Sequence, residues 1–167
     1  MKIRTGFVSN SSSSSFVVAF GTKPKNKAEL MTMMFPDGGV FIQAYNDRVP
    51  VESVVDTVWN DMKDQKPMTF DEVVEEIASG WFSGKPDSND YVDYNRDESP
   101  EKRQEQWAAY DKASAAAAAL LAQTFMGANA GSTFYRFSYA DEDGSYYCTL
   151  EHGDIFNRLA HMRISHH

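Results

Sequence analysis

Unbroken apolar runs along this chain predict two short β-strands in its first quarter. The run FVVAF at residues 16–20 is closed by Gly21, and an unbroken run of that length is typical of a strand buried on both faces. The run VFI at residues 40–42 follows the turn-forming sequence PDGG and predicts a second strand.

Apolar residues repeat with a helical period in three segments before residue 82. Asn26 can cap a short helix over residues 26–34, and Pro50 sits in the first turn of a second helix. Thr69 and Glu72 match a capping box at the start of a third helix, which Gly80 ends. The predicted buried face of the second helix is Val51, Val54, Val55, Val58, Trp59 and Met62, and that of the third is Phe70, Val73, Val74, Ile77 and Trp81.

The longest predicted helix begins at Ser99 and Pro100 and continues to about Met126. It follows residues 83–99, whose polar, turn-rich sequence predicts a surface loop. The residues expected on its core face are Trp107, Tyr110, Ala117, Leu120, Leu121 and Phe125.

The C-terminal part alternates with the period of a strand. Thr133, Tyr135, Phe137 and Tyr139 share one face of a strand predicted over residues 133–139. We expect a hairpin loop at 141–144, a return strand over 145–150, a helical turn over 155–159 and a last strand over 162–165. This order of elements favours an α+β fold with a small antiparallel or mixed sheet of about four to five strands and three to four packed helices, in one domain spanning residues 1–167.

Composition supports a folded protein of a reducing compartment. The chain has 167 residues, and 42% apolar with 24% charged residues is ordinary for a globular protein. A single cysteine, Cys148, rules out a disulfide within the chain. No apolar run reaches about eighteen residues and no apolar segment follows Lys2 and Arg4, so we expect a cytoplasmic protein without a membrane span or secretory signal.

The net charge of −8 narrows the class of partner. Binding to duplex nucleic acid through a basic patch is not expected, because that affinity comes largely from Lys and Arg. An acidic protein can bind a basic protein surface or imitate nucleic acid, while the alternative is that the charge only maintains solubility.

Five consecutive serines precede the first predicted strand. Their hydroxyls and backbone N–H groups could cradle a phosphate or another anion, and one hydroxyl could act as a nucleophile or accept a modification. The alternative is a turn that satisfies its own polar groups, since a phosphate loop would want glycines and a following Lys. The candidate anion-binding residues are Arg4, Ser9, Asn10, Ser11, Ser12, Ser13, Ser14 and Ser15.

All four histidines lie in the last sixteen residues. His152, Asp154 and His161, closed by His166 or His167, are candidates for zinc or another divalent metal, or for a metal-free acid–base site. Adjacent strand residues point to opposite faces, so only one of the last two histidines can join a given site. The alternatives are a hydrogen-bonded structural role or the remains of a purification tag; no HExxH, HxH or CxxC spacing occurs, and no cofactor is expected.

The two ends of the chain carry a resemblance. KIRTGFVSNSSSSSF at residues 2–16 resembles an N-terminal signature of small proteins of bacteriophages, bacteria and large viruses, and EHGDIFNRLAHMRISHH at 151–167 resembles the ending of some phage members. The resemblance implies a phage-like setting and carries over no catalytic residue. It also suggests that the two ends belong together, so that the serines and histidines meet.

Three functions remain open at the level of sequence. The first is a phage-type accessory protein that binds a host or viral protein through an acidic surface, as a host-takeover or anti-defence factor. The second is an enzyme or ligand-binding domain whose Ser and His site acts on a phosphorylated small molecule or nucleotide. The third is a virion structural component, for which oligomerisation would be the test.

Overall fold

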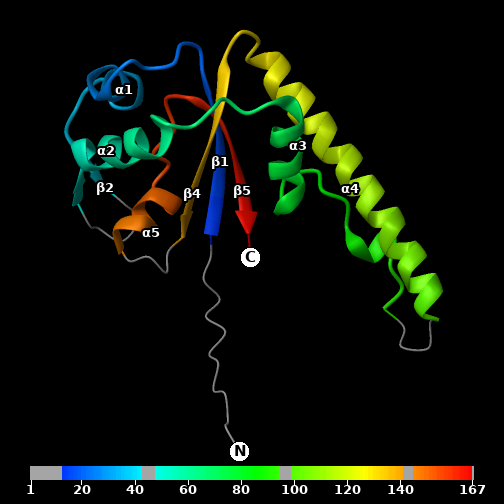
Figure 1. The fold of residues 1–167 in the computed structure, drawn as a ribbon. Helices are drawn as coiled ribbons and strands as arrows, with labels where there is room; N and C mark the ends of the chain where they lie inside the picture. The colour runs from blue at the N-terminus through cyan, green and yellow to red at the C-terminus, as the bar shows by residue number, and fades with distance from the viewer. Residues whose placement is uncertain (1–12, 43–47, 95–98, 141–144, 167) are drawn as a thin grey trace, which may run out of the picture.

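A computed structural model of the chain describes residues 13–42, 48–94, 99–140 and 145–166, and the predicted α+β fold is confirmed (Figure 1). The elements in chain order are β1 (Ser13–Phe20), α1 (Lys27–Met34), β2 (Val40–Ile42), β3 (Arg48–Pro50), α2 (Val51–Met62), α3 (Phe70–Ser79), the short 3-10 helix η1 (Ser88–Asp90), α4 (Pro100–Ala128), β4 (Thr133–Ala140), α5 (Ser145–His152) and β5 (Ala160–His166). The strands of these ranges divide between two sheets. The larger is antiparallel with the order β4-β1-β5, and β2 pairs with β3.

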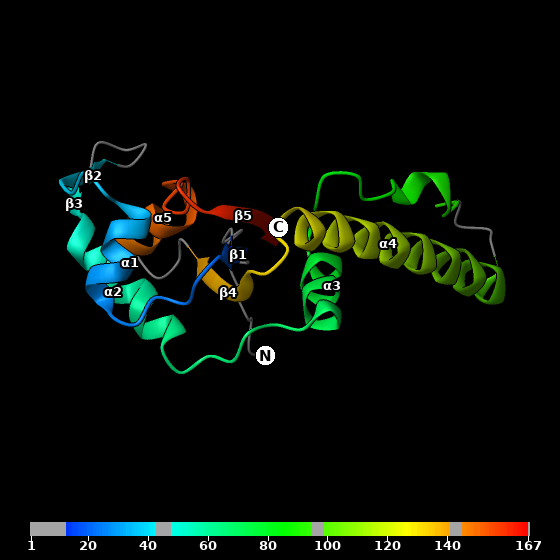
Figure 2. The ribbon, with the colours of Figure 1, turned by 90° about the horizontal axis from the view of Figure 1, so that it is seen from above.

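Strand β1 is the centre of the molecule and is buried on both faces, as its unbroken apolar run predicts. Phe16, Val18 and Phe20 enter one hydrophobic core, which α1, α2 and α5 cover. Val17 and Ala19 enter a second core on the opposite face, which α3 and α4 cover. Figures 1 and 2 show these two helical layers on either side of the sheet.

The three helices predicted before residue 82 are confirmed, but two of the residues predicted to lie in the core are exposed. The capping box forms in full, because the Thr69 hydroxyl accepts from Glu72 N–H and the Glu72 carboxylate accepts from Thr69 N–H. Phe70 and Trp81 were expected in the core, but they are 43% and 64% exposed. Phe70 opens the first turn of α3 and Trp81 lies beyond its end, so neither residue faces the sheet.

Helix α4 packs through small residues rather than through its aromatic ones. Ser114, Ala118 and Ala122 are buried, whereas Leu120 is 65% exposed and Trp107 is also exposed, contrary to the predicted core face. Side chains of one or a few atoms let α4 approach α3 closely, and only its C-terminal half makes this contact. Its N-terminal half extends beyond the sheet as an arm (Figures 1 and 2). Of the other predicted core residues, Ala117, Leu121 and Phe125 do pack against the second core.

The predicted return strand over residues 145–150 is wrong, because this segment forms helix α5. Tyr146, Cys148 and Leu150 recur every second residue, which fits a strand. Tyr146 and Leu150 are also four residues apart, a spacing that places both on one face of a helix. As a helix, the segment places Leu150 in the first hydrophobic core and Tyr146 against it. The Tyr146 hydroxyl donates to Ser53 O at 2.8 Å, which fixes α5 against α2.

Tyr139 provides a prediction of pH dependence. Burial, and then the Asp61 carboxylate to which its hydroxyl donates at 3.2 Å, raise the pKa of Tyr139 well above its ordinary value. The folded protein keeps this proton where the unfolded chain releases it, so stability is lost as pH rises above about 10. In urea unfolding between pH 8 and 11, Tyr139→Phe should show a shallower loss of unfolding free energy than the parent protein. Burial also raises the pKa of Tyr146, so some slope should persist. Equal slopes for parent and variant would contradict this assignment.

Candidate functional site

The two ends of the described chain meet in the sheet, as the resemblance suggests. In the ladder between β1 and β5, Ser13 lies opposite His166, Ser14 opposite Ser165 and Ser15 opposite Ile164. Adjacent strand residues point to opposite faces, so Ser14 and Ser15 enter two different polar clusters. The remaining serine-tract candidates, Arg4, Ser9, Asn10, Ser11 and Ser12, lie outside the described residues.

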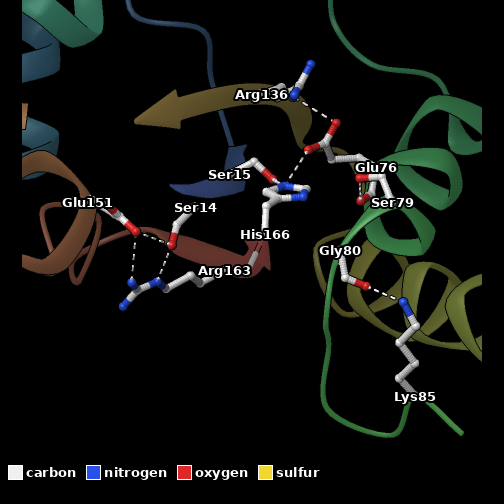
Figure 3. Close-up of polar contacts among 10 residues, drawn as sticks. All are labelled: Ser14, Ser15, Glu76, Ser79, Gly80, Lys85, Arg136, Glu151, Arg163 and His166. Atoms are coloured by element: carbon white, nitrogen blue, oxygen red, sulfur yellow. Dashed lines mark hydrogen bonds and ion pairs between the residues drawn. The ribbon is translucent and has the colours of Figure 1, made fainter. Parts of the chain in front are cut away.

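The first cluster surrounds the buried carboxylate of Glu151 (Figure 3). The Ser14 hydroxyl donates to Glu151 Oε1 at 3.1 Å and accepts from Arg163 Nε at 3.1 Å. Arg163 Nη2 lies 3.9 Å from the same carboxylate oxygen and donates to His152 Nδ1 at 3.1 Å. A guanidinium therefore offsets the charge of a carboxylate whose residue is only 1% exposed, and Ser14 connects the two groups.

The second cluster lies on the opposite face of the sheet. Ser15 Oγ is 2.9 Å from His166 Nε2, and this nitrogen is 3.8 Å from Glu76 Oε1. The other oxygen of the Glu76 carboxylate pairs with Arg136 Nε at 2.7 Å. Figure 3 shows these side chains in a row of contacts, from Arg136 to Glu76 to His166 to Ser15. They come from β4, α3, β5 and β1 respectively.

Neither cluster has the geometry of an activated serine nucleophile. In a Ser-His-acid relay the hydroxyl and the carboxylate contact different imidazole nitrogens, whereas Ser15 and Glu76 both approach Nε2 of His166. Ser14 and Ser15 are also 0% exposed, so a substrate cannot reach either hydroxyl. What these contacts can do is join the chain ends to the helices on both faces of the sheet.

The candidate metal ligands do not converge. Among the described residues, no three His, Cys, Asp or Glu side chains lie close enough to hold one ion. Asp154 is exposed and has a φ of 54°, a left-handed conformation that Asp tolerates, in the turn after α5. The ring of His161 packs against Phe16 and Phe156, and its Nδ1 contacts Leu159 O at 3.0 Å. This is a structural role, one of the alternatives for the histidines.

A hollow of about 890 Å³ lies beside the second cluster. Its walls come from the end of α3, the segment after it, α4 and the end of β5, and they include Gly80, Trp81, Lys85, Pro86, Tyr110 and His166. The Lys85 ammonium donates to Gly80 O at 2.7 Å (Figure 3). It also lies over the Phe82 ring, so this cation is already engaged within the chain. Of the candidate residues that the structure describes, only His166 borders the hollow.

Aromatic side chains continue from this hollow along the arm. Tyr110, in the wall of the hollow, lies 5.6 Å from the Trp107 ring and 6.0 Å from the Tyr91 ring, and Trp107 lies 6.4 Å from the Tyr94 ring. We call Trp81, Tyr91, Tyr94, Trp107 and Tyr110 the aromatic track. All but Tyr110 are exposed large hydrophobic residues.

Local contacts hold the track in place. The segment before α4 returns along that helix, where Asp93 N–H donates to the Gln106 side chain at 3.3 Å and the Tyr94 hydroxyl donates to Ser88 Oγ at 2.9 Å. Val92, in the same segment, is buried, with 4% of its surface exposed. The sequence predicts a surface loop here, and the tyrosines among its turn formers are the signal that could have indicated exposed aromatic side chains.

Comparison with protein-family models, with curated proteins and with solved structures gives no significant match. No helix among the described residues is both long and apolar enough to cross a bilayer.

Proposed function

We propose that this chain is a binding protein. Its aromatic track, together with the hollow that Trp81 and Tyr110 line, binds a partner protein. The observation that carries the proposal is the exposure of the track. Trp and Tyr dominate the energetically important residues of protein interfaces, because they remove a large area from water at a small cost in conformational entropy. Four exposed aromatic side chains grouped on one side of a molecule are uncommon on a surface that has no partner.

The shape of the arm supports the same proposal. The N-terminal half of α4 adds nothing to either hydrophobic core, since the buried residues of this helix begin at Ser114. A helix that extends past the body, with an ordered segment packed along it, presents a surface that the fold itself does not need (Figure 2). We infer that the arm serves recognition.

Charge favours a basic partner. Residues 51–79, which include α2 and α3, contain eight acidic and two basic residues and so contribute −6 of the net charge of −8. These residues divide between the helical layers on the two faces of the sheet, so they give an acidic balance rather than one patch. Such a balance attracts basic surfaces and accelerates encounter with them.

The biological setting that we propose is a phage-type accessory factor, acting in the cytoplasm of a host on a host or viral protein. This is the setting implied by the resemblance of the two chain ends, and a host-takeover or anti-defence role fits a small acidic binding protein. The part of the serine tract that the structure describes does not favour the alternative of a Ser and His site for a phosphorylated ligand. The two buried serines cannot reach a ligand, and Lys85 is directed to a backbone carbonyl.

The test is capture of a partner by matched variants. The immobilised parent protein should retain a stoichiometric partner from bacterial lysate, and Trp81→Ala should weaken that complex by about 2 kcal/mol, or roughly thirtyfold, because an exposed anchor residue is removed. Leu120→Ala is the control, since this side chain is as exposed as Trp81 but lies outside the track. Equal capture by both variants, or no stoichiometric partner, would count against the proposal.

A further inference from the structure

The chemistry of the hollow limits what kind of segment a partner can insert there. Edge-strand addition is blocked at this point, because Trp81 already pairs with the outer edge of β5. Trp81 N–H donates to Ser165 O at 2.7 Å, and Ser165 N–H donates to Trp81 O at 3.2 Å. A partner strand would have to break this pair before it could extend the sheet beside the hollow.

An amphipathic helix is also a poor occupant. Grooves that accept helices are lined by aliphatic side chains that receive residues one turn apart. The described residues that line this hollow include no Leu, Ile, Val or Met, and they supply mainly aromatic rings, a proline, hydroxyls and charged groups.

Flat rings with polar edges suit an extended polyproline II segment. Such a segment has no internal hydrogen bonds, and its proline rings pack on aromatic faces with little loss of conformational entropy. Trp81, Pro86 and Tyr110 offer that surface in the hollow, and Trp107 and Tyr94 continue it along the arm.

The acidic residues of the loop beside the track favour positive charge in the partner segment. Asp87, Asp90 and Asp93 lie on the segment that borders the hollow and carries two of the track tyrosines. The one cation among the described residues of this loop, Lys85, is directed to Gly80 O. Residues 80–94 thus hold three acidic residues and one basic residue, and this acidic balance complements Arg or Lys in an incoming segment.

We propose that the partner segment bound by the aromatic track is an extended, proline-containing peptide with flanking basic residues. This inference depends on the proposed binding function and specifies the chemistry of its partner.

The test uses three fluorescent twelve-residue peptides in anisotropy titrations with the full chain. The first has two PxxP repeats and two arginines, the second has the prolines replaced by alanine, and the third has the arginines replaced by glutamate. We expect the first peptide to bind at least tenfold more tightly than the other two. Trp81→Ala and the double variant Asp87→Asn with Asp90→Asn should each weaken its binding by about tenfold, while Leu120→Ala should leave it unchanged.

Two results would overturn the inference. One is equal binding of the proline and alanine peptides, and the other is equal affinity of the parent protein and Trp81→Ala for the first peptide. The proposed function can still stand in either case, because a lysate partner that depends on Trp81 but lacks affinity for proline-rich peptides would show a binding protein of a different specificity. Circular dichroism spectra like that of the parent are required of every variant, and Trp107→Ala provides a second anchor substitution at a separate point of the track.

Discussion

Replacing Gly80 with alanine is expected to lower the free energy of unfolding by about 3 kcal/mol, at the upper end of the usual cost of overpacking. A Cβ atom at this position would lie 2.4 Å from Ile164 Cγ2 and 2.6 Å from Ser165 O. The second contact is with backbone, so a rotamer change cannot relieve it. Strand β5 or the end of α3 must move, and the pairing of Trp81 with Ser165 moves with it. Urea unfolding followed by circular dichroism measures the effect.

Gly127→Ala is the matched control for this substitution. Gly127 lies in the last turn of α4, and a Cβ there would meet nothing within 4 Å. Because alanine has the higher helix propensity, this variant should be unchanged or more stable by up to about 1 kcal/mol. An unfolding midpoint for Gly80→Ala as high as that of Gly127→Ala would show that α3 does not approach β5 as closely as described.

Replacing Glu151 with alanine should destabilise the protein by about 2–3 kcal/mol, because the substitution breaks a buried ion pair and leaves a buried hydroxyl without its acceptor. The loss stays below the upper range for buried pairs because the Arg163 side chain is 37% exposed and can turn to water. The Ser14 hydroxyl has no such freedom, since Ser14 is fully buried between β4 and β5. Thermal and urea unfolding would both report the loss.

An exposed glutamate supplies the comparison for Glu151. Glu75→Ala, next to the buried Glu76 on α3, should change stability by no more than about 0.5 kcal/mol. The double variant of Glu151→Ala with Ser14→Ala should cost less than the sum of the single changes, since the two groups share a hydrogen bond. Additive costs would mean that Ser14 and Glu151 act independently.

The parts of the fold that could be predicted are those in which local signals decide the structure. The buried strand at Phe16–Phe20 follows from an unbroken apolar run, the third helix from the Thr69 and Glu72 capping box, and the alternating strand from Tyr135, Phe137 and Tyr139. The meeting of the chain ends was also predicted, but from a resemblance of sequence motifs rather than from any physical signal in the residues.

The errors arise where tertiary contacts decide. Tyr146 and Leu150 suit both a strand and a helix, and their contacts with α2 and the first core favour the helix. The facing of α4 depends on how closely α3 approaches, which selects Ser114 and Ala118 over Trp107. The hollow is formed by three stretches far apart in sequence, residues 79–88, Tyr110 and residues 165–166, so no local pattern could reveal it. The serine and histidine candidates that the structure describes lie mostly in the polar contacts that hold the ends of the sheet. Of these candidates, only His166 also borders the hollow.

We propose that the aromatic track provides recognition and that the polar clusters at the chain ends only hold the sheet together. The most direct test measures the affinity of one captured partner for Trp81→Ala and Ser15→Ala in parallel, with both variants folded by circular dichroism. We predict a loss of roughly thirtyfold for Trp81→Ala and parent-like affinity for Ser15→Ala. The reverse pattern, in which loss of the Ser15 hydroxyl abolishes binding and loss of the indole does not, would contradict the account.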